Sequence, residues 1–77
     1  MSPVVEYRDA ITTVLGEEST PLHWTVIQDL ALRRGYLDPF TQRDIRRNLL
    51  AALASMAKEG MVTKTDVGMF ALAKDAE

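Results

Sequence analysis

The order of hydrophobic patterns between Pro21 and Leu72 constrains the fold of this chain more than any other feature. A short extended segment is followed by a helical pattern, a short turn at Gly35, a longer helical pattern and two strand patterns, over 61–65 and 69–72. Three residues separate the two strands, a spacing typical of a tight hairpin. The sequence therefore predicts two successive helices that lead into an antiparallel β-hairpin.

A further helix is expected before this segment. Apolar residues recur at steps of three and four between Tyr7 and Leu15, the spacing of one helix face. Pro3 suits the first helical position, because the N–H group that it lacks would have no partner there. We expect a helix over 3–15 that ends at Gly16.

The first inner helix has a recognisable start and end. Thr25 and Gln28 have the spacing of a capping box, in which each side chain accepts a backbone N–H of the first turn. Gly35 suits the left-handed position that follows many helices. Before this helix, His23 is expected to form a structural hydrogen bond at the strand–helix junction, and Trp24 to lie in the core.

The second inner helix is expected over about 42–59. Thr41 is its predicted N-cap, and Phe40 and Ile45 have the spacing of a hydrophobic staple. Gly60 is the predicted end of the helix. Its inner face is apolar and its opposite face carries cations.

Together, these elements predict a mainly α fold with a small antiparallel β-hairpin, of the α+β class. Three helices followed by a hairpin are typical of a winged helix-turn-helix. A chain of 77 residues has room for one domain over 1–77. We expect its core to cover about 4–73, with a frayed tail at 74–77.

The charge of the chain is unevenly distributed. The formal net charge of −2 argues against strong nonspecific binding to nucleic acid. Residues 29–58, however, contain six Lys or Arg against three Asp, whereas residues 1–20 contain one Arg against four Asp or Glu. A local positive surface can attract a polyanion even when the total charge is negative.

Arg43, Arg46 and Arg47 are the first candidates for function, because they are expected on the first turns of the second inner helix. A guanidinium group offers a planar fork of donors that fits guanine or a phosphate, and a helix-turn-helix presents such residues to the major groove. The alternative is a solvated helix face with local ion pairs. The other DNA-binding candidates are Thr41, Gln42, Arg33, Arg34 and Lys64.

The residues that enzymes and metal sites use are sparse. The chain has no cysteine and one histidine, so we expect no metal site, no cofactor and no catalysis. No apolar run approaches the roughly 20 residues of a membrane span, and no signal peptide is recognisable. A cytoplasmic protein, located at the nucleoid or in the nucleus when bound to DNA, is expected.

The segment Pro21-Leu22-His23-Trp24-Thr25-Val26-Ile27 resembles the start of the second helix in the HARE-HTH family. Thr41, Gly60 and the final strand are also similar, and the resemblance covers roughly residues 4 to 73. This winged helix-turn-helix family occurs in restriction endonucleases, in the delta subunit of bacterial RNA polymerase and in eukaryotic chromatin proteins. The resemblance implies a DNA-binding or transcription-associated module.

Two functions follow from these observations. In the first, the helix over 42–59 enters the major groove of double-stranded DNA. In the second, the module is an adaptor that docks on a protein of transcription or DNA processing without touching DNA. The chain is expected to be a monomer or a weak homodimer through its first helix.

Overall fold

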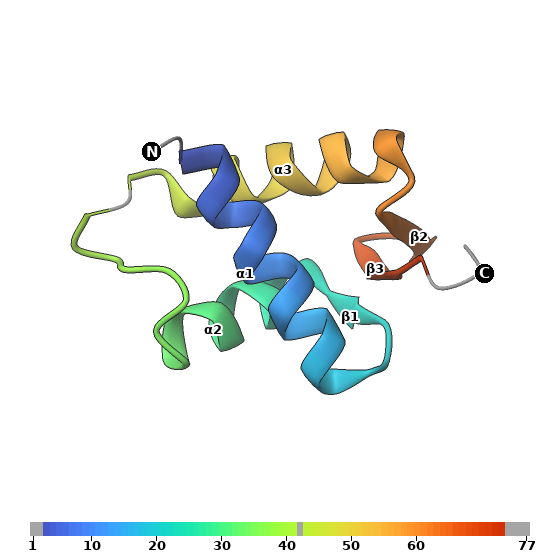
Figure 1. Cartoon of the computed structure of the whole chain (residues 1–77), viewed down its shortest axis with the longest axis horizontal. Helices are drawn as coiled ribbons and strands as arrows, with labels where there is room; N and C mark the ends of the chain where they lie inside the picture. The colour runs from blue at the N-terminus through green and yellow to red at the C-terminus, as the bar shows by residue number, and fades with distance from the viewer. Residues whose placement is uncertain (1–2, 42, 74–77) are drawn as a thin grey trace.

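The computed structural model describes residues 3–41 and 43–73, and it contains three helices and a small sheet (Figure 1). The predicted α+β class is confirmed. Residue 42 and the predicted frayed tail at 74–77 lie outside the described residues. The elements are α1 (Pro3–Glu18), β1 (Leu22–His23), α2 (Trp24–Arg33), α3 (Ile45–Glu59), β2 (Val62–Asp66) and β3 (Met69–Leu72).

The sheet is antiparallel, with strand order β1-β3-β2. Leu22 pairs with Phe70 on one side of β3, and Val62 pairs with Leu72 on the other. The predicted hairpin is therefore confirmed, and a third, very short strand extends it. The sheet closes the core at the end of α3, while α1 crosses in front of α3 (Figure 1).

Apolar faces of all three helices form one core. The stripe predicted for the first helix is confirmed, because its members are at most 2% exposed. In α3 the predicted inner face is also buried, except for Ile45, which is half-buried. The largest fully buried side chains are Tyr7, Ile11, Val14, Leu15, Ile27, Leu49, Leu53 and Met56.

The prediction that α1 ends at Gly16 is wrong. The helix continues to Glu18, and the left-handed residue after it is Ser19, with φ of 57°. The amide of Ser19 donates to the carbonyl of Leu15 at 3.0 Å, so the last turn is closed beyond the glycine. Gly16 packs against the final strand, where an added Cβ would lie 3.8 Å from Leu72 Cδ1.

The capping box predicted for the first inner helix, α2, is also wrong. His23 is the N-cap of α2, and its Nδ1 accepts the backbone N–H of Thr25 at 3.2 Å. The Thr25 hydroxyl lies 2.9 Å from the same nitrogen, so it is engaged with His23 rather than with Gln28. The expectation of a structural hydrogen bond from His23 is confirmed, with the ring in the role of the cap.

The third helix begins later than predicted, at Ile45 instead of about residue 42. Thr41 does not cap it, because the Thr41 hydroxyl and amide both donate to the carbonyl of Asp38 in a preceding turn. Phe40 is 96% exposed, so the predicted staple with Ile45 does not form. The short turn predicted between the helices is instead a long connection over 34–44, visible beside the N-terminal end of α1 (Figure 1).

The predicted ends of α2 and α3 are confirmed. Gly35 and Gly60 have φ of 77° and 83°, a region that residues with a Cβ rarely adopt. After α2, the amide of Tyr36 donates to Ala31 and that of Gly35 to Leu32, the bond pattern of a Schellman motif. Tyr36 then packs against the core, as its place after the glycine predicts.

Candidate nucleic-acid interface

The basic residues singled out in the sequence lie in two separate places. The start of α2 contacts the start of α3, where the Arg46 guanidinium lies 5.3 Å from the centre of the Trp24 ring. The end of α2 contacts the end of α1, where Arg34 meets two carboxylates. The two ends of α2 are separated by the ten residues of the helix, roughly 14 Å. The structure therefore does not bring Arg33 and Arg34 together with Arg46.

The outward face of α3 consists of Arg47, Ala51, Ala54 and Lys58. All four residues are exposed, and they follow one another at helical steps of four, three and four. No carboxylate interrupts this face, and its middle is made of small side chains. Such a face can approach a polyanion closely without steric or electrostatic opposition.

Arg43 lies just before α3 and not on it, which corrects its predicted position on the first turn. It is exposed, and its carbonyl accepts the Asn48 side-chain amide at 2.8 Å. Within residues 3–41 and 43–73, no ion pair is found for Arg43, Arg46 or Arg47. Their guanidinium groups therefore keep their charge available to a partner.

The acid at the far end of α3 is neutralised. Glu59 forms an ion pair with Arg8 of α1, and this hydrogen bond lowers the pKa of the Glu59 carboxyl. Lys58, one residue earlier, points to the outward face instead. The charge of α3 is therefore divided between a paired acid toward α1 and free cations toward solvent.

The hairpin lies next to the start of α2. The Trp24 amide donates to the Gly68 carbonyl at 2.9 Å, and the His23 ring packs closely over Gly68. Lys64 is exposed on β2, opposite Phe70. Val67, at the tip of the hairpin, is 83% exposed. The start of α2 thus adjoins the hairpin tip through Gly68 and the start of α3 through Arg46.

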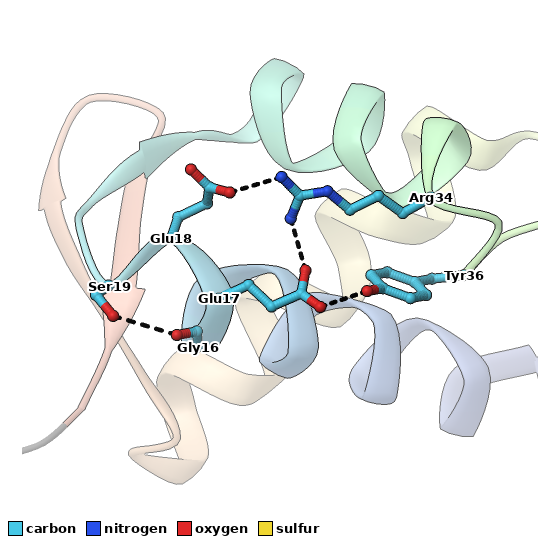
Figure 2. A network of polar contacts seen from close by, with 6 residues as sticks. All are labelled: Gly16, Glu17, Glu18, Ser19, Arg34 and Tyr36. Carbon is cyan, nitrogen blue, oxygen red and sulfur yellow. Dashed lines mark hydrogen bonds and ion pairs between the residues drawn. The ribbon is translucent and has the colours of Figure 1, made fainter.

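Arg34, at the end of α2, is already occupied by acids of the same chain (Figure 2). Arg34 Nη1 lies 2.6 Å from Glu17 Oε1, and Arg34 Nη2 lies 2.7 Å from Glu18 Oε2. Tyr36 donates a hydrogen bond to Glu17, which lowers the pKa of that carboxyl, and Arg34 acts in the same direction. This network ties the end of α1 to the end of α2, and it makes Arg34 a structural residue.

Arg33 is also paired, although weakly. Its Nε lies 3.0 Å from Asp29 Oδ2 one turn earlier on α2, and both side chains are well exposed. Exposed pairs of this kind contribute little to stability and dissociate easily. Among the described residues that were predicted to bind DNA, Arg34 and Arg33 are thus the two with a carboxylate partner. Gln42 lies outside the described residues.

Sequence spacing did not reveal these pairings because the acids around Arg34 lie far upstream on another helix. It also placed Trp24 in the core. Trp24 does pack against the core, but it is only half-buried, and Arg46 lies over its ring. A cue was present for Trp24. An aromatic residue at the start of α2 and arginines at the start of the next helix can meet when the two helices cross.

A cleft of about 330 Å³ lies on another side of the molecule, between α1 and the connection that follows α2. Its lining includes the acidic residues Glu6, Asp9 and Asp38 together with Tyr36. This acidic character opposes the binding of a polyanion there. The described ranges contain no group of three or more His, Cys, Asp or Glu placed to hold a metal ion, and no described helix is long and apolar enough to cross a membrane.

Comparisons with known proteins add no relative. No protein-family model matches the chain, and neither a curated protein nor a solved structure matches it. The resemblance to the HARE-HTH family therefore stays a prediction from the residues. Function is inferred from the geometry of α3 and its neighbours.

Proposed function

We propose that this protein is a winged helix-turn-helix module of the HARE-HTH type that binds double-stranded DNA through α3. The observation that carries the proposal is the outward face of α3, which is exposed, cationic at both ends and without a carboxylate. An α-helix fits the major groove of B-DNA, and its first residues contact base edges in helix-turn-helix proteins. Arg46 and Arg47 occupy the first turn of α3.

Each neighbouring element has a role in this proposal. Arg47 approaches the bases, while Arg43 and Lys58 contact phosphates on either side of the groove. The start of α2 supplies the positive end of its helix dipole, which attracts a phosphate. Lys64 and the hairpin tip form the wing, which lies along the backbone of the duplex.

The negative net charge of the chain is compatible with this role. Several acids are paired within the protein, namely Glu17 and Glu18 with Arg34, Glu59 with Arg8, and Asp29 with Arg33. Pairing shortens the reach of their field, so a phosphate near α3 meets mainly the unpaired arginines. Binding of this kind is moderate in strength and sensitive to salt.

Fluorescence anisotropy with a labelled duplex of mixed sequence, between about 50 and 200 mM salt, tests the proposal. Arg47→Ala should weaken binding, because a bidentate contact to a base, worth about 1–3 kcal/mol, is lost. Arg33→Ala is the matched control, because it removes the same charge from the other end of α2. No binding in dilute buffer, or equal losses from both variants, would overturn the proposal.

The second candidate is an adaptor that binds a protein with an apolar pocket. It is favoured by Phe40, which is 96% exposed in the connection between α2 and α3. An exposed aromatic side chain is a typical anchor residue in protein interfaces. Phe40→Ser should abolish capture of such a partner while leaving the affinity for DNA unchanged. A Phe40→Ser variant that captures the same partner equally well contradicts this candidate.

A further inference from the structure

Three side chains, one each from β1, α2 and α3, form a continuous stack at the proposed interface. The rings of His23 and Trp24 have centroids 5.7 Å apart and are tilted by 33°. The Arg46 guanidinium lies over the Trp24 ring at 5.3 Å. The His23 ring is fixed by its bond to the Thr25 amide and by its packing over Gly68. The stack therefore joins the hairpin tip, the start of α2 and the start of α3.

The position of Arg46 over a ring has a specific chemical consequence. An arginine on an aromatic face is attracted through the flat side of its guanidinium group, so the N–H groups at its edge remain free to donate. A free Arg side chain samples many rotamers, and ordering it on binding costs affinity. An arginine already held by a ring has lost part of that freedom before the ligand arrives.

The contrast with Arg47 supports this interpretation. Arg46 and Arg47 are adjacent, both exposed and both without an ion pair in the described part of the chain. Of the two, it is Arg46 that lies over an aromatic ring, that of Trp24. Arg47 is therefore a matched reference for the effect of the ring on an arginine in the same helix turn.

We propose that Trp24 is a positioning residue that holds Arg46 as a preformed two-donor fork for a pair of acceptor atoms on DNA. This inference rests on the proposed function. The acceptor pair is either the O6 and N7 edge of guanine or two oxygens of one phosphate, because both fit the guanidinium fork. His23 acts through Trp24 by limiting the tilt of the indole.

The free protein tests the contact without DNA. The ring current of the indole should shift the side-chain protons of Arg46 upfield in NMR spectra, relative to those of Arg47. Trp24→Phe should retain part of the shift and Trp24→Leu should remove it. Equal shifts for Arg46 and Arg47 in the unaltered protein would overturn the inference.

A double-mutant cycle then tests the role in binding. Trp24→Leu should weaken binding to a mixed-sequence duplex about two- to fivefold when Arg46 is present. It should have no further effect when Arg46→Met has removed the guanidinium, and Trp24→Phe should restore part of the loss. A loss of equal size in both backgrounds identifies a structural role and overturns the inference. Arg46 is exposed, so Arg46→Met should leave the fold intact. The effect of losing the guanidinium can therefore be measured even if Trp24→Leu is less stable.

A duplex of A·T pairs alone distinguishes the two acceptors. If Arg46 binds guanine, Arg46→Met removes the preference for the mixed duplex over the A·T duplex. If it binds a phosphate, Arg46→Met weakens both duplexes equally and reduces the salt slope by about 0.9. A protein that binds neither duplex overturns the proposed function and this role together, whereas binding without coupling between Trp24 and Arg46 overturns this role alone.

Discussion

Replacing Gly68 with Ala should destabilise the protein more than the same change at its other left-handed glycines. Gly68 has φ of 72°, and a Cβ there would lie 2.7 Å from His23 Nε2 and 3.0 Å from His23 Cδ2. The backbone cannot retreat easily, because the Gly68 carbonyl accepts the Trp24 amide at 2.9 Å. The His23 ring must therefore move away from the hairpin.

The expected loss of stability in Gly68→Ala has two contributions. A residue with a Cβ in the left-handed region costs about 1–2 kcal/mol. Movement of His23 weakens its bond to the Thr25 amide, and loss of an N-cap costs about 0.5–2 kcal/mol. We expect Gly68→Ala to lower the free energy of unfolding by about 2–3 kcal/mol, out of roughly 4–12 kcal/mol for a domain of this size.

Gly35→Ala and Gly60→Ala are matched controls. Both glycines have positive φ, but an added Cβ meets nothing within 4 Å at either position. In these variants the free energy of unfolding should therefore fall only by the cost of the left-handed conformation, about 1–2 kcal/mol. Urea unfolding followed by circular dichroism measures all three, and with a slope near 1 kcal/mol per molar the midpoints separate clearly.

The His23→Ala background isolates the steric contribution. Without the ring, Gly68→Ala should cost no more than Gly35→Ala, so the two changes at the hairpin should be less than additive. Equal costs for Gly68→Ala and the two control glycines in the unaltered protein would refute the reasoning, as would additive costs for His23 and Gly68.

The remaining predictions concern helix α1, the polar network and the cap. Gly16→Ala should raise the free energy of unfolding by about 0.5–1 kcal/mol in the same urea assay, because Gly16 lies inside the helix with room for a Cβ. His23→Ala should lower it by about 0.5–2 kcal/mol through loss of the N-cap. Stability should fall as the pH drops below 4.5, the ordinary pKa of Glu17 and Glu59, because their lowered pKa values mean that the folded protein binds fewer protons. Tyr36→Phe should reduce this acid effect, measured as melting temperature against pH. The raised pKa of Tyr36 means that its contribution is complete below pH 10 and is lost as the pH rises through the folded value.

Helix faces and the ends of α2 and α3 could be predicted from the sequence because they depend on neighbours three or four residues away. The stripe from Tyr7 to Leu15, the inner face of α3 and the left-handed positions of Gly35 and Gly60 are all such cases. The hairpin could be predicted for the same reason, since its strands are joined by a short turn. The α+β class follows from these local features alone.

The helix starts required the tertiary structure, because several polar side chains compete for each cap. Thr41 bonds back to Asp38 instead of forward to α3, and His23 takes the cap that Thr25 was expected to provide. The His23 ring can do so because Gly68 of the hairpin leaves room for it. Local spacing contains no information about a hairpin more than forty residues away.

Packing between distant segments also decided which partner each arginine has. Arg34 is neutralised by Glu17 and Glu18, which α1 brings to it, whereas Arg46 meets the ring of Trp24. Arg34 and Arg46 both belong to the basic segment over 29–58, and the sequence does not show which of them is paired. The sequence by itself determined that this protein has a basic middle on amphipathic helices, and only the tertiary structure decided which cations remain free, because charge is paired by distance in space and not along the chain.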